Sequence, residues 1–237
     1  MQTKIQKVKD YFNETDNYLK NNLLIALRSR LIKKNLPDLK NKRILDIGCG
    51  NGELTLPYIK DNKITYIDLS DKMLEIVRSN IPIEYYQNAK FLNIDFEKFD
   101  LTEKYDYLFM IGVLAHVNSI EMAFSKIVGL LDSNGTLIVQ FTNHRNVLSF
   151  IIRLIFEIKK ILWKKLDYKV NNTSLQKIKK ELKKNKLEYY NKVNYWPPIP
   201  GFSLLPMGIR KFIYYKLLNS ILLRPLGSEI LLFISLV

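Results

Sequence analysis

The stretch Ile44-Leu-Asp-Ile-Gly-Cys-Gly-Asn-Gly-Glu53 constrains the fold of this 237-residue chain more than any other feature. A short apolar run that ends in alternating glycines predicts a strand, a tight turn and a helix start. Glycine lets the backbone turn sharply and approach a ligand closely, and such turns are typical of nucleotide-like cofactor sites. The dinucleotide fingerprint Gly-x-Gly-x-x-Gly requires a glycine where this chain has Glu53. The turn therefore predicts a nucleotide-like cofactor, and the rest of the sequence is needed to identify it.

Strands and helices alternate on both sides of this turn. The apolar runs predict strands at Arg43–Ile47, Lys63–Asp68, Lys90–Asp95, Tyr107–Val113 and Thr136–Phe141. Helical spacing predicts helices at residues 17–36, ended by Pro37, from about Asp71, and at Ile120–Leu131, with a turn at Asp132-Ser-Asn-Gly135. This alternation is typical of a parallel sheet built from strand–helix–strand units.

The rhythm changes after Phe141. We expect an apolar helix at 147–167, a lysine-rich helix at Thr173–Asn185, a strand at Leu187–Trp196, a Pro/aromatic segment up to Phe202, a helix at 208–223 and a last strand at Glu229–Val237. The predicted fold is α/β: a doubly wound, mostly parallel seven-stranded sheet with an antiparallel last strand, helices on both faces and a helical lid. One domain would comprise a helical cap (1–40), a cofactor-binding core (41–143), a lid or substrate insertion (144–185) and C-terminal strands with a helical insertion (186–237).

Two carboxylates close predicted strands on the same edge of the sheet. Asp68 ends the second strand, where a carboxylate can accept both hydroxyls of a ribose. Its alternative role as a helix N-cap is better filled by Ser70 or Asp71. Asp95 ends the third strand and can accept from an adenine amine, with the backbone N–H of Phe96 facing a ring nitrogen; the alternative is a turn aspartate.

With these residues in place, the chain resembles the class I, Rossmann-like S-adenosylmethionine-dependent methyltransferases of the small-molecule type. The resemblance runs in order from about residue 8 to 143. It rests on the glycine turn, on Tyr66-Ile-Asp-Leu-Ser70, on Asn93-Ile-Asp-Phe96, on Tyr105–Val117 and on Leu130–Val139.

The resemblance implies S-adenosylmethionine as cofactor and a set of residues around it. The methionine part would lie at Asp46, Gly48, Cys49, Gly50 and Gly52, the ribose at Asp68 and Leu69 with Met73 nearby, the adenine at Asp95 and Phe96, and the methionine amine at a carbonyl of Met110 or Ile111. Pro57 departs from the family pattern, because it interrupts the helix that normally follows the turn.

The reaction implied is an in-line displacement in which the protein mainly supplies proximity and alignment. A general base can help when a hydroxyl is methylated, and histidine is suited to that role near neutral pH. The two candidates are His116, after the fourth strand, and His144, after the fifth. Each has a structural alternative, as a cofactor-supporting or plain loop histidine. No cluster has metal-ligand spacing, so we expect a metal-free enzyme.

The formal net charge of +14 would suit nucleic acid or an anionic membrane. Lysine, asparagine and isoleucine are abundant throughout, which favours compositional drift, and arginines interleaved with aromatics are missing. The Asn/Asp-Pro-Pro-Tyr/Phe motif of amino-methylating nucleic-acid enzymes is replaced by Ile111-Gly-Val-Leu114. We therefore do not expect nucleic acid as a partner.

The acceptor is expected to be a small or amphiphilic metabolite: a quinone-type ring, a lipid-linked molecule or a sugar precursor. Helix 147–167 carries a polar stripe only one row wide, so it either packs as a lid or inserts into an anionic membrane surface. With no signal peptide visible, we expect a cytoplasmic protein, with the inner face of the membrane as an alternative location. Two other functions stay open, an NAD(P)-dependent oxidoreductase and a catalytically silent cofactor-binding module.

Overall fold

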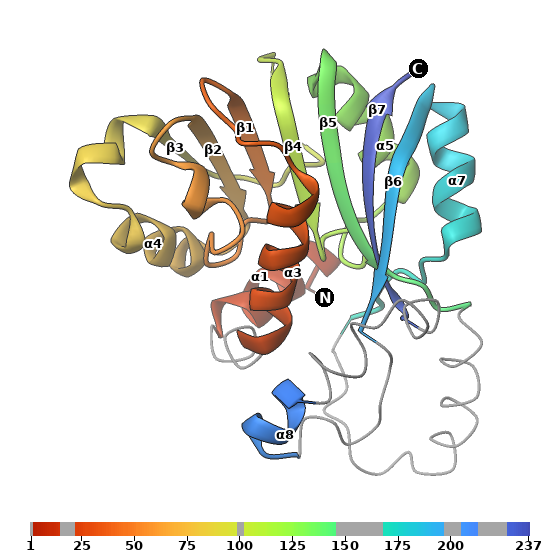
Figure 1. Ribbon diagram of the computed structural model, residues 1–237. Helices are drawn as coiled ribbons and strands as arrows, with labels where there is room; N and C mark the ends of the chain where they lie inside the picture. The colour runs from red at the N-terminus through yellow and green to blue at the C-terminus, as the bar shows by residue number, and fades with distance from the viewer. Residues whose placement is uncertain (1, 15–21, 99–101, 146–167, 197–204, 213–226) are drawn as a thin grey trace.

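The computed structural model describes residues 2–14, 22–98, 102–145, 168–196, 205–212 and 227–237 (Figure 1). The expected apolar helix at 147–167, the Pro/aromatic segment after Trp196 and most of the expected helix at 208–223 lie outside these residues.

Seven strands form one sheet in the order β3-β2-β1-β4-β5-β7-β6. They are β1 (Arg43–Ile47), β2 (Lys63–Asp68), β3 (Ala89–Asn93), β4 (Tyr105–Ile111), β5 (Leu131–Thr142), β6 (Leu187–Tyr195) and β7 (Glu229–Leu236). The pairs from β3 to β5 are parallel, and β7 runs antiparallel to both β5 and β6. The predicted doubly wound sheet with an antiparallel last strand is confirmed.

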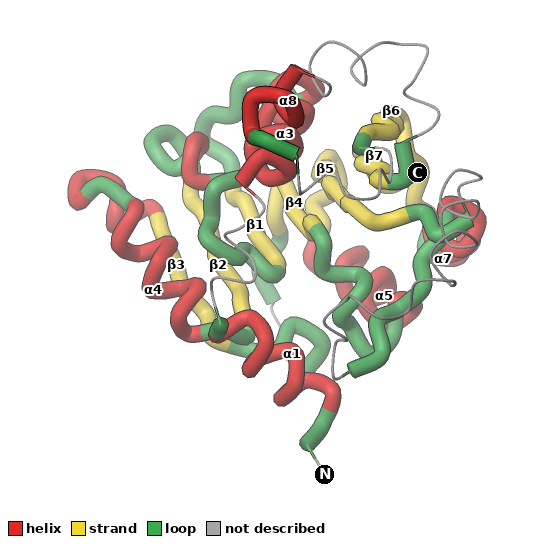
Figure 2. Tube along the Cα trace, turned by 90° about the horizontal axis from the view of Figure 1, so that it is seen from below, coloured by secondary structure: helices red, strands yellow, loops and turns green. Residues whose placement is uncertain are grey.

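Helices cover both faces of the sheet. The longer ones are α1 (Lys4–Asn13), α3 (Asn22–Asn35), α4 (Asp71–Asn80), α5 (Ile120–Leu130), α7 (Leu175–Lys184) and α8 (Met207–Phe212); η1 (Leu56–Tyr58) and η2 (Ile83–Asn88) are short 3-10 helices. Side chains of α3 and α4 share one buried cluster with the sheet, and those of α5 and α7 share the other. Figure 2 shows α3 and α5 on opposite sides of the strands. The central strands are therefore buried on both faces, as their apolar runs require.

Serine side chains fix where three of the helices begin. Ser70, Ser119 and Ser174 each accept a hydrogen bond from the backbone N–H three residues later. This N-cap satisfies a donor that the first helical turn leaves without an intrahelical partner, typically worth about 1 kcal/mol. Ser70 also donates to Asn13 Oδ1 at 2.6 Å and so links α4 to the end of α1.

The predicted local structure is incomplete at one place and wrong at another. The sequence does not predict α1, because lysines obscure the apolar face that Ile5, Val8 and Phe12 form; the expected helix at 17–36 corresponds to α3, and its first residues lie outside the described ranges. The predicted turn at 132–135 lies inside β5, where the pairing with β4 jumps from Tyr105↔Leu131 to Tyr107↔Thr136. The turn residues form an irregularity within the strand rather than its beginning. Pro57 lies in η1, so the segment after the glycine turn is a 3-10 turn, as its proline suggested.

Candidate active site

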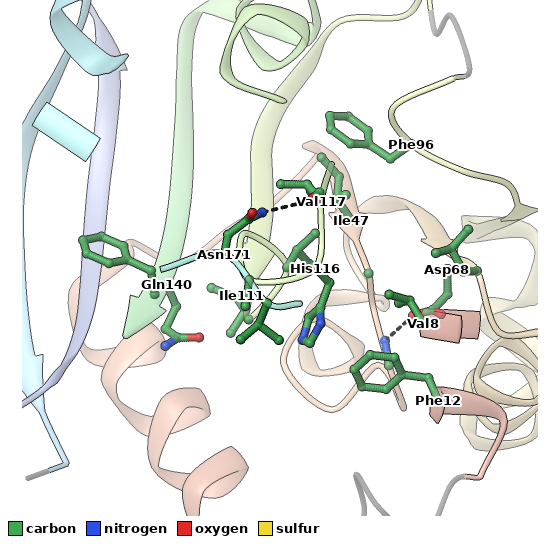
Figure 3. A pocket seen from close by; sticks show the side chains of 18 of the residues that line it. Val8, Phe12, Ile47, Asp68, Phe96, Ile111, His116, Val117, Gln140 and Asn171 are labelled. Carbon is green, nitrogen blue, oxygen red and sulfur yellow. Dashed lines mark hydrogen bonds between the residues drawn. The ribbon is translucent and has the colours of Figure 1, made fainter. Parts of the chain in front are cut away.

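One cavity of about 460 Å³ lies where the parallel strands end, a volume typical of small-molecule sites. Its walls come from the ends of β1, β2, β4 and β5, from α1 and α3, and from residues 170–173 (Figure 3). The strand order reverses between β1 and β4, and open α/β sheets bind ligands at such a switch point. We call the part of the cavity lined by β1, β2 and the segment after β3 the β1–β3 half, and the part lined by β4, β5 and β7 the β4–β7 half.

Gly48 and Gly50 of the glycine turn form the floor of the β1–β3 half. Gly48, Gly50 and Gly52 have φ values of +64°, +54° and +72°, which side chains with a Cβ rarely adopt. A Cβ on Gly48 would lie 2.5 Å from Cγ2 of Val113, in the segment after β4. The backbone at Gly48 therefore comes close to the β4–β7 half only because a side chain is absent.

Asp68 holds the turn in place and lines the cavity. One of its oxygens accepts from the backbone N–H of Gly50 at 2.9 Å, and the other accepts from that of Ser70 at 2.8 Å. Burial raises the pKa of Asp68, and these backbone donors oppose that shift. A carboxylate accepts about four hydrogen bonds, so Asp68 keeps capacity for a ligand's hydroxyl groups.

Asp95 lies farther along the same wall. Its Oδ1 accepts from the backbone N–H of Glu97 at 3.0 Å, whereas Oδ2 is buried and has no hydrogen-bond partner among the described residues. A buried oxygen without a donor is costly, so Asp95 Oδ2 fits a ligand that brings an N–H group. Phe96 lines the cavity beside it, and the ring is buried.

The other residues implied for the cofactor divide into two groups. Gly48, Gly50, Asp68, Leu69, Asp95, Phe96 and Ile111 line the cavity. By contrast, Asp46, Cys49, Gly52, Met73 and Met110 lie behind its wall, and the side chains of Met73 and Met110 are fully buried in the core.

Asp46 is buried next to the glycine turn and does not line the cavity. Its Oδ2 accepts from Thr55 Oγ1 at 2.5 Å, and Thr55 is fully buried. Burial raises the pKa of Asp46 to about 7, which the Thr55 hydrogen bond opposes and the nearby Asp68 charge increases. The side chain thus supports the turn, and any contact of this segment with a ligand would pass through the backbone.

His116 projects into the cavity among aromatic rings (Figure 3). Its Nδ1 lies 3.0 Å from the hydroxyl of Tyr168, and the Phe12 ring meets it edge to face at 5.2 Å. Burial lowers the pKa of His116 to about 4, and the charge of Lys4 adds to this effect. Burial also raises the pKa of Tyr168 to about 12. His116 is therefore a neutral imidazole near pH 7, held from one side by a protonated tyrosine.

Residues 168–173 bring that tyrosine to the site. The Asn171 side chain donates to the carbonyl oxygens of Leu114 and Val117, and its backbone N–H donates to Ala115 (Figure 3). His144 also lines the cavity, and its backbone N–H donates to the Thr173 carbonyl at 3.0 Å. Both candidate histidines thus lie on the cavity, and the segment that contacts them belongs to the expected insertion at 144–185.

Sequence reasoning missed a polar group in the β4–β7 half. Arg28, Gln140, Thr142 and Glu229, which we call the Glu229 cluster, all line the cavity. Arg28 comes from α3, and Glu229 begins β7. The signal was present in the sequence, since Gln140 interrupts the apolar run of β5 and Glu229 opens that of β7.

The β1–β3 half fits a nucleoside-bearing cofactor such as S-adenosylmethionine, because Asp68, Asp95 Oδ2 and the Cβ-free floor at Gly48 meet in one cavity. In the described part of the chain no three or more His, Cys, Asp or Glu side chains gather as metal ligands would. Likewise, none of the helices in the described ranges is long and apolar enough to cross a membrane.

Comparison with known proteins identifies the family. The model of a methyltransferase domain family matches residues 38–196, more than half of the chain. The chain is 26% identical over 144 residues to the ubiquinone biosynthesis O-methyltransferase of Pelagibacter ubique, covering 58% of this chain and 56% of that protein. It is 33% identical over 104 residues to the malonyl-[acyl-carrier protein] O-methyltransferase of Acetivibrio thermocellus, covering 43% and 36%. The chain spans about half, or less, of the length of these relatives.

Solved structures support the same assignment at the level of the fold. A crystal structure of an S-adenosylmethionine-dependent methyltransferase from Thermotoga maritima superimposes with a TM-score of 0.68 at 17% identity, covering 98% of this chain and 99% of the other. The chain belongs to the methyltransferase domain family, and its fold is that of the class I S-adenosylmethionine-dependent methyltransferases that its motifs resemble.

Proposed function

We propose that this chain transfers a methyl group from S-adenosylmethionine to a small or amphiphilic metabolite. The observation that carries the proposal is that Asp68 and Asp95 in one half, and His116 and the Glu229 cluster in the other, line the same cavity. S-adenosylmethionine supplies a methyl group that is already activated for displacement. The protein then has to bind two molecules, align them and exclude water.

The β1–β3 half would hold the cofactor. Asp68 would accept the ribose hydroxyls with Leu69 beside them, and Asp95 with Phe96 would frame the adenine. The backbone from Gly48 to Gly50 would hold the methionine part, together with a carbonyl near Ile111. In this proposal Asp46, Cys49, Gly52, Met73 and Met110 act from behind the wall, by fixing the shape of the turn and of the strands.

His116 would receive the proton in the β4–β7 half. A hydroxyl oxygen becomes strongly acidic as it acquires a methyl group, so an imidazole with a pKa near 4 is basic enough to take its proton. That role needs a free lone pair on Nε2, and therefore the tautomer in which Nδ1–H donates to Tyr168. His144, which lines the same cavity and whose backbone N–H donates to the Thr173 carbonyl, stays the alternative base.

The helix α1 would exclude water from the reaction. Val8 and Phe12 line the cavity, and Lys4 donates to the Val117 carbonyl at 2.6 Å, so the helix is fastened over the segment that carries His116. Displacement reactions are favoured when the reacting atoms are aligned and solvent is removed.

The relatives support a small-molecule acceptor. Two of them are named for O-methylation in ubiquinone biosynthesis and of malonyl-[acyl-carrier protein]. A quinone-type ring, a lipid-linked molecule and a sugar precursor remain the candidate acceptors. The apolar walls formed by α1, α3 and β5 suit the first two.

Isothermal titration with S-adenosylmethionine tests the proposal, followed by detection of S-adenosylhomocysteine when acceptors are added. We expect micromolar binding that Asp68→Ala weakens about 100-fold. Absence of binding, or binding that Asp68→Ala leaves unchanged, would contradict the proposal. A fluorescence change with NAD(P)H would favour the oxidoreductase alternative, and binding without any product would favour the catalytically silent module.

A second proposal concerns access to an amphiphilic acceptor, by peripheral association with an anionic membrane surface. It rests on α8, where Met207, Ile209 and Phe212 are exposed beside Lys211, and on the net charge of +14. Co-sedimentation with phosphatidylserine vesicles at physiological salt tests it. Failure to pellet would contradict it, and Phe212→Ser should reduce pelleting without changing cofactor affinity.

A further inference from the structure

The Glu229 cluster holds the side-chain amide of Gln140 in one orientation. One carboxylate oxygen of Glu229 accepts from Gln140 Nε2 and from Arg28 at 3.3 Å, and the other accepts from Thr142 Oγ1 at 2.7 Å. Arg28 also donates to the hydroxyl of Tyr195 at 2.9 Å. Because a carboxylate accepts hydrogen bonds only, the nitrogen of Gln140 must face Glu229 and the oxygen must face the other way.

That oxygen faces the cavity. Gln140 is only 1% exposed, and within the described ranges its Oε1 has no hydrogen-bond partner. Figure 3 shows the amide oxygen pointing toward the interior of the cavity, on the side of Ile111. A Cβ on Gly112 would lie 3.7 Å from this oxygen, so the missing side chain keeps the approach open. A carbonyl oxygen that is buried without a donor is unfavourable, so a ligand that donates to it is favoured.

The position of Gln140 assigns it to the methyl acceptor rather than to the cofactor. Gln140 pairs with Ile111 in the sheet register, and β5 lies on the side of β4 that is opposite to β1. Asp68 and Asp95, which would hold the cofactor, lie beyond β1 on the other side. Leu24, Ile25 and Phe141 line the cavity as well, so the acceptor meets an apolar wall there.

We propose that Gln140 Oε1, fixed by Glu229, selects the methyl acceptor by accepting a hydrogen bond from its O–H or N–H group. The site then takes a hydroxyl- or amine-bearing molecule with an apolar body and rejects a carboxylate. A carboxylate has no hydrogen to donate and would face two acceptors, Gln140 and Glu229, while the charge of Arg28 is offset by Glu229 and two of its N–H groups donate to Glu229 and Tyr195. This inference rests on the proposed function, since it names the acceptor class for the same site.

A matched set of probes tests the preference on the full chain saturated with S-adenosylhomocysteine. The probes are 4-butylcatechol, its dimethyl ether and 4-butylbenzoate, which share an apolar body and differ in hydrogen-bond donor and charge. Titration by NMR should give a dissociation constant for the catechol at least tenfold below those of the other two. Equal binding of the ether or the benzoate, or no binding of the catechol at millimolar concentration, would overturn the inference.

Two variants separate the oxygen of Gln140 from the rest of the cluster. Gln140→Met and Thr142→Val each remove one donor from Glu229, but only the first removes Oε1 from the cavity. The tenfold preference for the catechol should disappear in Gln140→Met and persist in Thr142→Val. A preference that survives in Gln140→Met would overturn the inference.

Glu229→Gln should reverse the selection. An amide at position 229 can donate to Gln140 Oε1, so the Gln140 amide can turn its nitrogen to the cavity, and Arg28 loses its carboxylate partner. Binding of 4-butylbenzoate should then improve at least tenfold relative to the wild-type chain, a gain that damage to the fold would not produce. No gain in a variant that still binds S-adenosylhomocysteine would contradict the inference. A wild-type chain that does not bind S-adenosylhomocysteine would instead contradict the proposed function.

Discussion

The two halves of the cavity are assembled in different ways. In the β1–β3 half, the polar groups follow consecutive strands, and the Gly50–Asp68 contact joins residues only 18 positions apart. In the β4–β7 half, Arg28 and Glu229 are separated by 201 positions, and His116 meets Tyr168 across 52. The first half is built from local motifs at strand ends, and the second from tertiary contacts between distant segments.

This difference reflects what each half would bind. A cofactor that many enzymes share can be held by one short motif at each strand end, so its site can be predicted from the sequence alone. An acceptor differs from one enzyme to the next, and its site is built from whichever segments the fold brings over the strand ends. We therefore expect mutations in the first half to change cofactor binding and those in the second to change acceptor use.

Gly48→Ala should have the largest effect, because it acts where the two halves meet. The new Cβ would lie 2.5 Å from Cγ2 of Val113 at a φ of +64°, so the turn or Val113 must shift. We expect cofactor affinity to fall at least 1,000-fold and the free energy of unfolding to fall by about 3 kcal/mol, an order-of-magnitude figure for strain at such positions. Calorimetry and urea unfolding measure the two quantities.

Gly129→Ala is the matched control. Nothing lies within 4 Å of a Cβ at this position in α5, and alanine is the better helix former by up to about 1 kcal/mol. This variant should be as stable as the wild-type chain or more so, with unchanged affinity. A Gly48→Ala variant that binds normally would show that the halves do not touch through this turn.

Substitutions of the two carboxylates, Asp68 and Asp95, should show how much each contributes to cofactor affinity in the β1–β3 half. Asp68→Asn changes an acceptor that holds the Gly50 N–H and that would also accept from the proposed cofactor, so it should weaken S-adenosylmethionine binding about 100-fold. Asp95→Asn should weaken S-adenosylmethionine binding about tenfold, because it changes only one of the proposed contacts with the cofactor. Titration calorimetry measures both, and the catechol preference of the saturated protein should be unchanged. An altered preference would mean that the halves are not independent.

Acidification should affect the β4–β7 half through His116. Because the folded-state pKa is about 4 and the ordinary value is 6.5, the unfolded chain binds more protons between these limits. This contribution to stability is therefore complete above pH 6.5 and is lost as the pH falls through about 4. In His116→Gln the free energy of unfolding should depend less on pH between about 4 and 6.5. The same variant should lower kcat about 30-fold at pH 7. An unchanged kcat would remove His116 as the base and leave His144.

Asp46→Asn should have the smallest effect on cofactor affinity, less than about threefold, because the side chain contacts Thr55 behind the turn. The contribution of Asp46 to the free energy of unfolding depends on pH in the opposite sense to that of His116. Burial raises the pKa from 3.8 to about 7, so this contribution is complete below pH 3.8 and is lost as the pH rises through 7. At pH 8 the Asp46→Asn variant should have a larger free energy of unfolding than the wild-type chain, by on the order of 2 kcal/mol. A large loss of affinity would indicate direct contact with the cofactor.

The sequence predicted most of the sheet and the β1–β3 half, because strand patterning and strand-end motifs are local. It did not predict α1, since the lysines of that helix hide its apolar face, and it placed a turn where β5 has an irregularity in register. It could not predict the Glu229 cluster. Gln140 and Glu229 stand out as polar residues in apolar strands, but only the antiparallel pairing of β5 with β7 brings them together.

A crystal structure of the chain with S-adenosylhomocysteine tests the central claim most directly. We expect the ribose at Asp68, the adenine amine at Asp95 Oδ2, and an open space between the cofactor and Gln140. Density for the nucleoside in the β4–β7 half, or an adenine that leaves Asp95 Oδ2 without a donor, would contradict it.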